Sequence, residues 1–160
     1  MVAPGNWVLL AYRLPREPST PRIGLWRDLR RLGVAQLLDG LVALPADSRT
    51  REQLEWLADS VVEAGGEASV WLGRPGSRAQ ERAIAQTMQA TVAAEYAKVI
   101  EQAYAASAAP FGSRSRTRTL GRLRRELRRV RRRDYFHAPE REQATAAVEA
   151  LAQGVEELAA

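Results

Sequence analysis

The dipeptide Asp39-Gly40 constrains the fold of this chain more than any other short segment. It lies between two apolar runs, Val34–Leu38 and Leu41–Leu44, and Pro45 ends the second run. An Asp-Gly pair between two such runs is a strong signal for a tight β-hairpin, because glycine adopts the positive φ that the turn requires. We therefore predict a hairpin here, against which the flanking segments must pack.

A strand and a helix are predicted before the hairpin. Trp7–Arg13 is a short apolar run with the length of a buried strand. Thr20-Pro21 is a good helix start, because proline fits the first helical turn, and Gly33 is a good helix stop. Between them, apolar residues recur at helical spacing: Leu25, Trp26, Leu29 and Leu32.

A helix and a strand are predicted after the hairpin. Thr50 and Gln53 have the spacing of a capping box at a helix start. Gly65-Gly66 would end this helix before a last strand, Ala68–Leu72. The predicted buried face of the helix consists of Leu54, Leu57, Ala58 and Val61.

The predicted order is β-α-β-β-α-β, which is typical of a ferredoxin-like domain in the α+β class. We assign residues 1–76 to this domain. Its elements contain all four tryptophans, Trp7, Trp26, Trp56 and Trp71, and we expect these large side chains in its core rather than at a cofactor or base-stacking site.

Residues 77–160 are predicted to form a helical extension packed on that domain. Gln80–Ala106 has no glycine or proline and should be one long amphipathic helix, which Pro110-Phe111-Gly112-Ser113 breaks. An Arg-rich helix at 118–133 and a last helix should follow as an antiparallel hairpin around the corner Asp134–Pro139. Their apolar seams are Leu120, Leu123, Leu127 and Val130, then Ala144, Val148, Leu151, Val155 and Leu158.

The positive charge of the chain is concentrated in one segment. Residues 1–109 hold 12 basic and 12 acidic side chains, whereas residues 114–133 hold 11 arginines and one acidic residue, Glu126. Residues 134–160 hold one basic and six acidic residues, which gives −5. The net charge of +5 is therefore a local property of the Arg-rich helix.

Five arginines of this helix are predicted to lie away from its apolar stripe. They are the candidate nucleic-acid-binding residues Arg122, Arg125, Arg128, Arg129 and Arg132. The phosphates of DNA would neutralise these arginines. Each such contact would also release counterions from the DNA, which adds to the affinity. A solvated face, pairing with the acidic last helix, a protein, a small oxyanion and a membrane surface are the alternatives.

The residue composition excludes several classes of site. The chain has no cysteine and one histidine, His137, so thiol catalysis, Cys-held metals and multi-histidine sites are excluded. No run of about 18 apolar residues suggests a membrane span. We expect a cytoplasmic protein that is not an enzyme and has no cofactor.

Short motifs distributed along the chain resemble one known family. They include Tyr12-Arg13, Trp26-Arg27, Gly65-Gly66-Glu67-Ala68, Glu95-Tyr96 and Arg133-Asp134-Tyr135-Phe136. In this order they resemble the N-terminal domain of the ChrB chromate-resistance regulators. The resemblance implies a bacterial regulator that acts at a promoter and responds to chromate, with kinship to PaaX-type repressors. ChrB proteins usually continue into a C-terminal domain, whereas this chain ends at Ala160.

The resemblance also suggests Arg13, Arg22 and Arg27 as residues that could hold an oxyanion such as chromate, although packing is their more ordinary role. The first half is similar to CRISPR adaptation nucleases as well. Those enzymes place an aspartate after the first strand, where this chain has Tyr12-Arg13-Leu14, so we do not expect nuclease activity. Two hypotheses remain: a DNA-binding regulator or regulator fragment, and a protein-interaction or homodimerisation module that binds no nucleic acid.

Overall fold

The computed structural model describes residues 5–110 and 112–160. Their contacts divide the chain into two compact units, Met1–Met88 and Gln89–Ala160, and the boundary falls within helix α3. The elements in chain order are β1 (Trp7–Arg13), α1 (Thr20–Leu32), β2 (Ala35–Leu38), β3 (Leu41–Pro45), α2 (Ser48–Glu63), β4 (Glu67–Gly73), α3 (Arg78–Ala108), α4 (Ser113–Arg132) and α5 (Glu140–Ala159).

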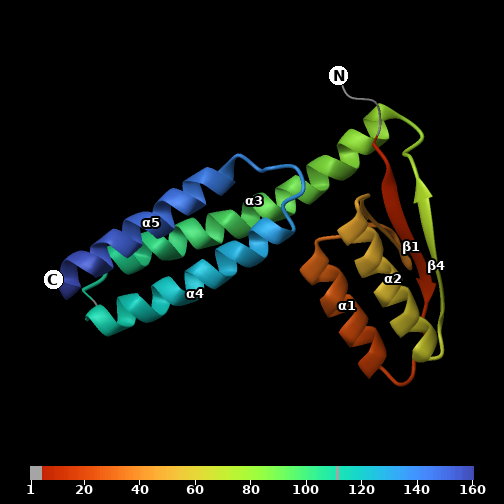
Figure 1. The fold of residues 1–160 in the computed structure, drawn as a ribbon, viewed down its shortest axis with the longest axis horizontal. Helices are drawn as coiled ribbons and strands as arrows, with labels where there is room; N and C mark the ends of the chain where they lie inside the picture. Colours follow the sequence, from red (N-terminus) through yellow and green to blue (C-terminus); the bar gives the residue numbers. More distant parts are fainter. Residues whose placement is uncertain (1–4, 111) are drawn as a thin grey trace. The chain divides into compact units, whose positions relative to one another are not determined.

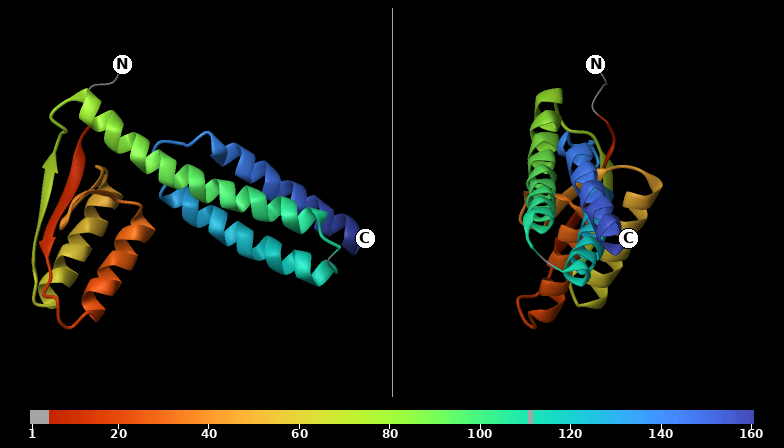
Figure 2. Two further views of the ribbon diagram at one scale, coloured as in Figure 1. Left: turned by 180° about the vertical axis from the view of Figure 1, so that it is seen from behind. Right: turned by 90° about the vertical axis from the view of Figure 1, so that its left-hand side faces the viewer.

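The first unit contains a four-stranded antiparallel sheet in the order β2-β3-β1-β4. Helices α1 and α2 lie side by side on one of its faces (Figures 1 and 2). The element order and the α+β class are those predicted from the sequence. The Asp39-Gly40 hairpin is confirmed, with Gly40 at φ 76°. A side chain at Gly40 would also clash with the carbonyl oxygen of Tyr12, 2.4 Å from an added Cβ.

The core of this unit lies between the sheet and the two helices. Alternate residues of β1 and β3 point towards the helices, as the two-residue period of a strand requires. From the helices, the predicted apolar face of α2 is buried. The buried residues of this core include Val8, Leu10, Val42 and Leu44 from the strands, Leu25 and Leu29 from α1, and Leu54, Leu57, Ala58 and Val61 from α2.

The expectation that all four tryptophans are core residues is wrong. Trp7 is buried, whereas Trp26, Trp56 and Trp71 are 58%, 71% and 62% exposed. The repeat of the helix or strand turns each of these three side chains away from the core. Trp26 is one residue beyond the buried Leu25, which turns it about 100° around α1, and Trp71 points to the sheet face opposite that of Val70.

The capping box of α2 lies one turn earlier than predicted. Asp47, in extended conformation, is the N-cap, and its carboxylate accepts a hydrogen bond of 2.7 Å from the Thr50 amide. The Thr50 hydroxyl accepts one of 3.0 Å from the Asp47 amide in return. Thr50 is therefore the third helical residue rather than the cap, and Gln53 has no part in the box.

The second unit is a bundle in which the later part of α3, α4 and α5 share one core (Figure 1). Helices α4 and α5 form the predicted hairpin, although α4 begins at Ser113 rather than at 118. The core includes Tyr96, Leu123, Val130 and Leu151, each at most 1% exposed. Leu158, the last residue of the predicted α5 seam, is instead 53% exposed. Phe111, part of the predicted break, lies outside the described residues.

Over the described ranges, no helix has both the length and the apolar character needed to cross a membrane.

Candidate nucleic-acid interface

Helix α4 is held in place by one apolar stripe. Leu120, Leu123, Leu127 and Val130 are all buried in the core of the second unit. They step by three or four residues, so together they fix which side of α4 faces the bundle. The residues on the other side of the helix are mostly arginines.

The five candidate arginines all lie on the exposed side of α4. Around a helix, Arg125 is almost opposite the centre of the buried stripe, with Arg122, Arg129 and Arg132 close to the same line and Arg128 beside it. Arg118 extends the line towards the start of the helix and is exposed as well. Helix α4, with 20 residues, is about 30 Å long. The structure thus gathers the predicted residues into one cationic stripe, called here the α4 arginine stripe: Arg118, Arg122, Arg125, Arg128, Arg129 and Arg132.

Several guanidinium groups of the α4 arginine stripe have no carboxylate partner in the described part of the chain. Arg129 pairs with Glu126 at 3.5 Å, and both side chains are substantially exposed, so this pair contributes little. Arg122 donates to the uncharged amide oxygen of Gln102 at 2.7 Å. Arg125 and Arg128 have neither a hydrogen bond nor an ion pair with any residue in the described ranges.

Pairing with α5 was the main alternative explanation of these arginines. The ion pairs found around α4 instead join Arg129 and Arg133 to Glu126 and Glu95, which belong to α4 and α3. The acidic residues of α5 therefore do not neutralise Arg125, Arg128 or Arg129 within the described part of the chain.

Other arginines of the Arg-rich segment have structural partners. Arg116 donates to the carbonyl oxygens of Ser107 and Ala109 at the end of α3, which otherwise lack helical donors. Arg131 donates to the Thr145 hydroxyl on α5. Arg131 lies beside the apolar stripe and is half-buried, whereas Arg114 and Arg124 are exposed outside the α4 arginine stripe.

Sequence reasoning missed a polar cluster that joins α3 to the corner after α4. The hydroxyl of the fully buried Tyr96 donates to the carboxylate of Asp134 at 2.9 Å. The same carboxylate accepts the Ala138 amide at 3.0 Å. Next to it, Arg133 forms a double hydrogen bond with Glu95. Two adjacent residues of α3 thus pair with two adjacent residues at the end of α4.

A signal for this cluster was present in the sequence. Glu95-Tyr96 and Arg133-Asp134 are two of the motifs that carry the family resemblance. The pairing of these two motifs could not be predicted from the sequence, because no helical or strand period connects residues 38 positions apart. Tyr135 and Phe136, which follow Asp134 in this corner, are partly buried.

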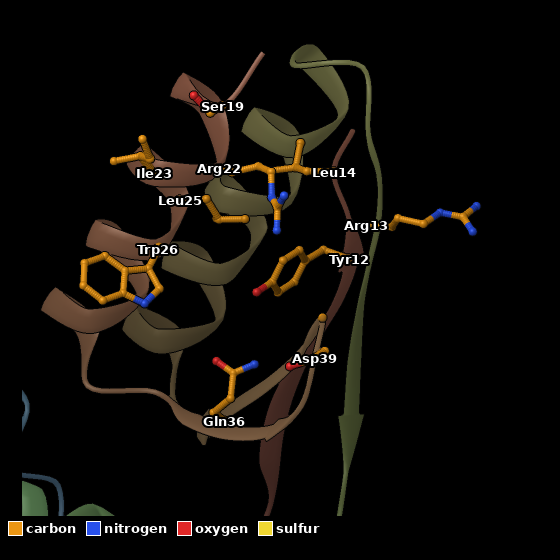
Figure 3. A pocket seen from close by; sticks show the side chains of 11 residues that line it. Tyr12, Arg13, Leu14, Ser19, Arg22, Ile23, Leu25, Trp26, Gln36 and Asp39 are labelled. Atoms are coloured by element: carbon orange, nitrogen blue, oxygen red, sulfur yellow. The ribbon is translucent and has the colours of Figure 1, made fainter. Parts of the chain in front are cut away.

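The three candidate oxyanion residues do not meet at one site. A hollow of about 950 Å³ at the end of β1 is lined by Tyr12, Arg13, Arg22, Trp26 and Asp39 among others. Figure 3 shows Arg22 directed towards the Tyr12 ring, whereas the Arg13 side chain extends away on the other side. There Arg13 pairs with Glu67 at 2.5 Å. Arg27 is exposed on α1 and is not part of the lining.

Two arginines thus belong to the lining, but only the Arg22 guanidinium is directed into the hollow. The guanidinium of Arg22 would attract an anion in the hollow, whereas the carboxylate of Asp39 would repel it. A tetrahedral oxyanion is held most strongly by several converging donors. The arrangement does not favour chromate binding in this hollow.

Comparison with known proteins places this chain in a family. The sequence model described as "Protein ChrB, N-terminal" matches residues 22–108, which is 87 of the 160 residues. The chain belongs to the ChrB N-terminal family. The family match runs from the first turn of α1 to the end of α3, and it ends before α4 begins.

A relative in this family is Protein ChrB of Cupriavidus metallidurans. It is 36% identical to this chain over 66 residues, which are 41% of the chain and 20% of the relative. The match thus spans about a fifth of the length of that relative. No solved structure matches the chain.

Proposed function

We propose that this ChrB-family chain is a DNA-binding regulator, or part of one, in chromate resistance, and that it contacts DNA phosphates through the α4 arginine stripe. The family supplies the biological setting. The observation that carries the DNA contact is a row of exposed guanidinium groups on α4, in which Arg125 and Arg128 form no ion pair within the described part of the chain.

The physical basis is electrostatic. Closely spaced cations on one helix face repel one another, and a polyanion relieves that repulsion. A DNA duplex carries about one negative charge per 1.7 Å of its length, so a helix of about 30 Å can contact several phosphates. Arginine suits this role because its planar guanidinium donates two parallel hydrogen bonds to a phosphate.

The contact proposed here concerns phosphates and not bases. Phosphate contacts fix position and supply affinity, whereas base contacts supply sequence preference. The proposal therefore concerns affinity and its salt dependence. We propose further that the chain acts by binding rather than as an enzyme.

The test compares two variants with the same change in net charge. Arg125, Arg128 and Arg129 are replaced together by glutamine in the first variant, which leaves the buried stripe of α4 intact. In the control, Arg16, Arg78 and Arg82 are replaced by glutamine; these exposed arginines belong to the first unit. Fluorescence anisotropy with a labelled duplex measures both.

We expect the first variant to bind the duplex at least about tenfold more weakly than the control, since tenfold corresponds to only about 1.4 kcal/mol shared by three charge contacts. Equal losses in the two variants would mean that only net charge matters, and the assignment to α4 would be wrong. Circular dichroism of both variants checks that the helices are retained.

A further inference from the structure

The two edges of the sheet in the first unit differ in a way that bears on association. Strand β2 has four residues, and its register with β3 shifts between Gln36 and Leu38. Strand β4 has seven residues and pairs with β1 from Glu67 to Gly73 without a shift. Short length and bulges protect an edge from pairing with another chain. The β2 edge therefore has this protection, and the β4 edge does not.

The composition of β4 gives no protection either. Its sequence, EASVWLG, contains neither lysine nor proline, and Glu67 at its start is its one charge. Near its other end Trp71 and Leu72 are 62% and 56% exposed and point to opposite faces of the sheet. In the described part of the chain, β1 is the one strand beside β4 (Figure 1).

Apolar surface continues from this edge on both faces of the sheet. On one face, Trp71 lines a hollow of about 340 Å³ together with Leu9 and Ile84. On the other face, Leu72 lines a second hollow beside Arg51 in the first turns of α2. A partner at the β4 edge would thus cover apolar side chains as well as the unpaired backbone.

The side chains of β4 are complementary to those of a second β4 in antiparallel orientation. When the two strands are centred on Val70, Trp71 lies opposite Ser69 of the other copy, and Leu72 lies opposite Ala68. Directly opposed residues point to the same face of an antiparallel sheet. Each large exposed side chain therefore meets a small one, and the two faces of the sheet remain continuous.

The charges at the two ends of β4 agree with the same orientation. Glu67 begins the strand, and Arg74 follows its last residue. Arg74 is exposed, and its Nε donates to the amide oxygen of Asn6 at 2.9 Å, so it has no carboxylate partner in the described part of the chain. Antiparallel pairing brings the end of each strand that carries Arg74 beside the end of the other strand that carries Glu67. The two side chains leave the strand towards opposite faces of the sheet, so the attraction is between oppositely charged strand ends and not a direct ion pair.

We propose that the β4 edge is a homodimer interface, at which two copies of this chain join their sheets through antiparallel β4 strands centred on Val70. The inference does not depend on the α4 arginine stripe, because all the residues that carry it belong to the first unit. A dimer of this kind would present two copies of the chain to any partner that it binds.

The experiment measures the molar mass of the full chain by sedimentation equilibrium over a range of concentrations. The test variant combines Trp71→Lys and Leu72→Lys, since lysine on an edge strand opposes pairing. Its control is Trp56→Lys, which replaces a tryptophan that is 71% exposed on α2, away from the strand. Circular dichroism and thermal unfolding check that each variant folds.

For the wild type we expect a mass approaching twice that of one chain, and for the double lysine variant a dissociation constant higher by about tenfold or more. The Trp56→Lys control should dimerise like the wild type. A wild type that stays monomeric, or a control that loses as much association as the test variant, would overturn the proposal.

A charge exchange tests the orientation without altering the apolar residues. Glu67→Arg alone and Arg74→Glu alone should each weaken the dimer, and the two together should restore it, because each strand end then again lies beside an end of opposite charge. Absence of this rescue would contradict antiparallel pairing centred on Val70. The variant without Arg125, Arg128 and Arg129 should remain dimeric, which separates failure of this proposal from failure of DNA binding.

Discussion

The hydroxyl of Tyr96 on α3 donates a 2.9 Å hydrogen bond to the carboxylate of Asp134, at the corner between α4 and α5. Both residues are buried, with Tyr96 fully inaccessible and Asp134 6% exposed. The Asp134 carboxylate also accepts the amide of Ala138, so it ties α3 to the turn that reverses the chain. This interaction fixes the end of α4 and hence the direction of the α4 arginine stripe.

Replacing Tyr96 with phenylalanine should destabilise the second unit. The substitution removes a hydrogen bond to a buried carboxylate, for which a loss of about 1.5–3 kcal/mol is expected. The control is Tyr104→Phe, at a tyrosine that is 64% exposed. Urea unfolding followed by circular dichroism measures the difference, and equal stability of the two variants would show that the Tyr96–Asp134 contact has no energetic role.

Alkaline pH should weaken the same contact. Burial, followed by the hydrogen bond to Asp134, raises the pKa of Tyr96 well above its ordinary value of 10.0. A group whose pKa is higher in the folded state stabilises the fold fully below its unfolded pKa, and that contribution is lost as the pH rises towards the folded pKa. The stability difference between wild type and Tyr96→Phe should thus shrink above about pH 10. Unfolding curves between pH 9 and pH 11 measure it, and a constant difference would be inconsistent with a buried, protonated Tyr96.

Truncation of the buried stripe of α4 should cost far more than truncation at the end of α5. Leu123 is fully buried, so Leu123→Ala should lower the free energy of unfolding by about 2–5 kcal/mol. Leu158 is 53% exposed and serves as the control, with an expected change within about 0.5 kcal/mol for Leu158→Ala. Similar costs for the two would mean that α5 packs along its whole predicted seam.

The N-terminal cap of α2 gives a test of the corrected capping box. Asp47→Ala removes the acceptor of the Thr50 amide and should cost about 0.5–2 kcal/mol. Gln53→Ala should change stability less, because Gln53 takes no part in the box. Thermal unfolding of the two variants distinguishes the assignments; a larger loss at Gln53 would favour the box predicted from sequence.

Local patterns were enough to predict the first unit, because its elements are short and end at glycine or proline. Asp39-Gly40 and Gly33 adopt the conformations that their positions required. The large size of a tryptophan favours burial, but its position in the helical or strand repeat decides which way it faces. Trp56 lies between the buried Leu54 and Leu57 in the sequence, yet it is on the opposite side of the helix and is exposed.

The exposed arginines of the candidate interface could be predicted from the helical period, whereas its contacts with distant segments could not. The period of α4 correctly separated its buried leucines from its exposed arginines. What no period reveals is which residues from distant segments meet. The pairing of Glu95-Tyr96 with Arg133-Asp134 and the separation of Arg13 from Arg22 both depend on tertiary structure.

The salt dependence of duplex binding tests the central proposal most directly. Each arginine that contacts a phosphate contributes about −0.9 to the slope of log K against log salt concentration. The slope for the Arg125, Arg128 and Arg129 to glutamine variant should therefore be shallower than that of the wild type by up to about 2.7, while the Arg16, Arg78 and Arg82 variant keeps a slope close to that of the wild type. A wild type that binds no duplex at low salt, or identical slopes for wild type and the α4 variant, would contradict DNA binding through α4.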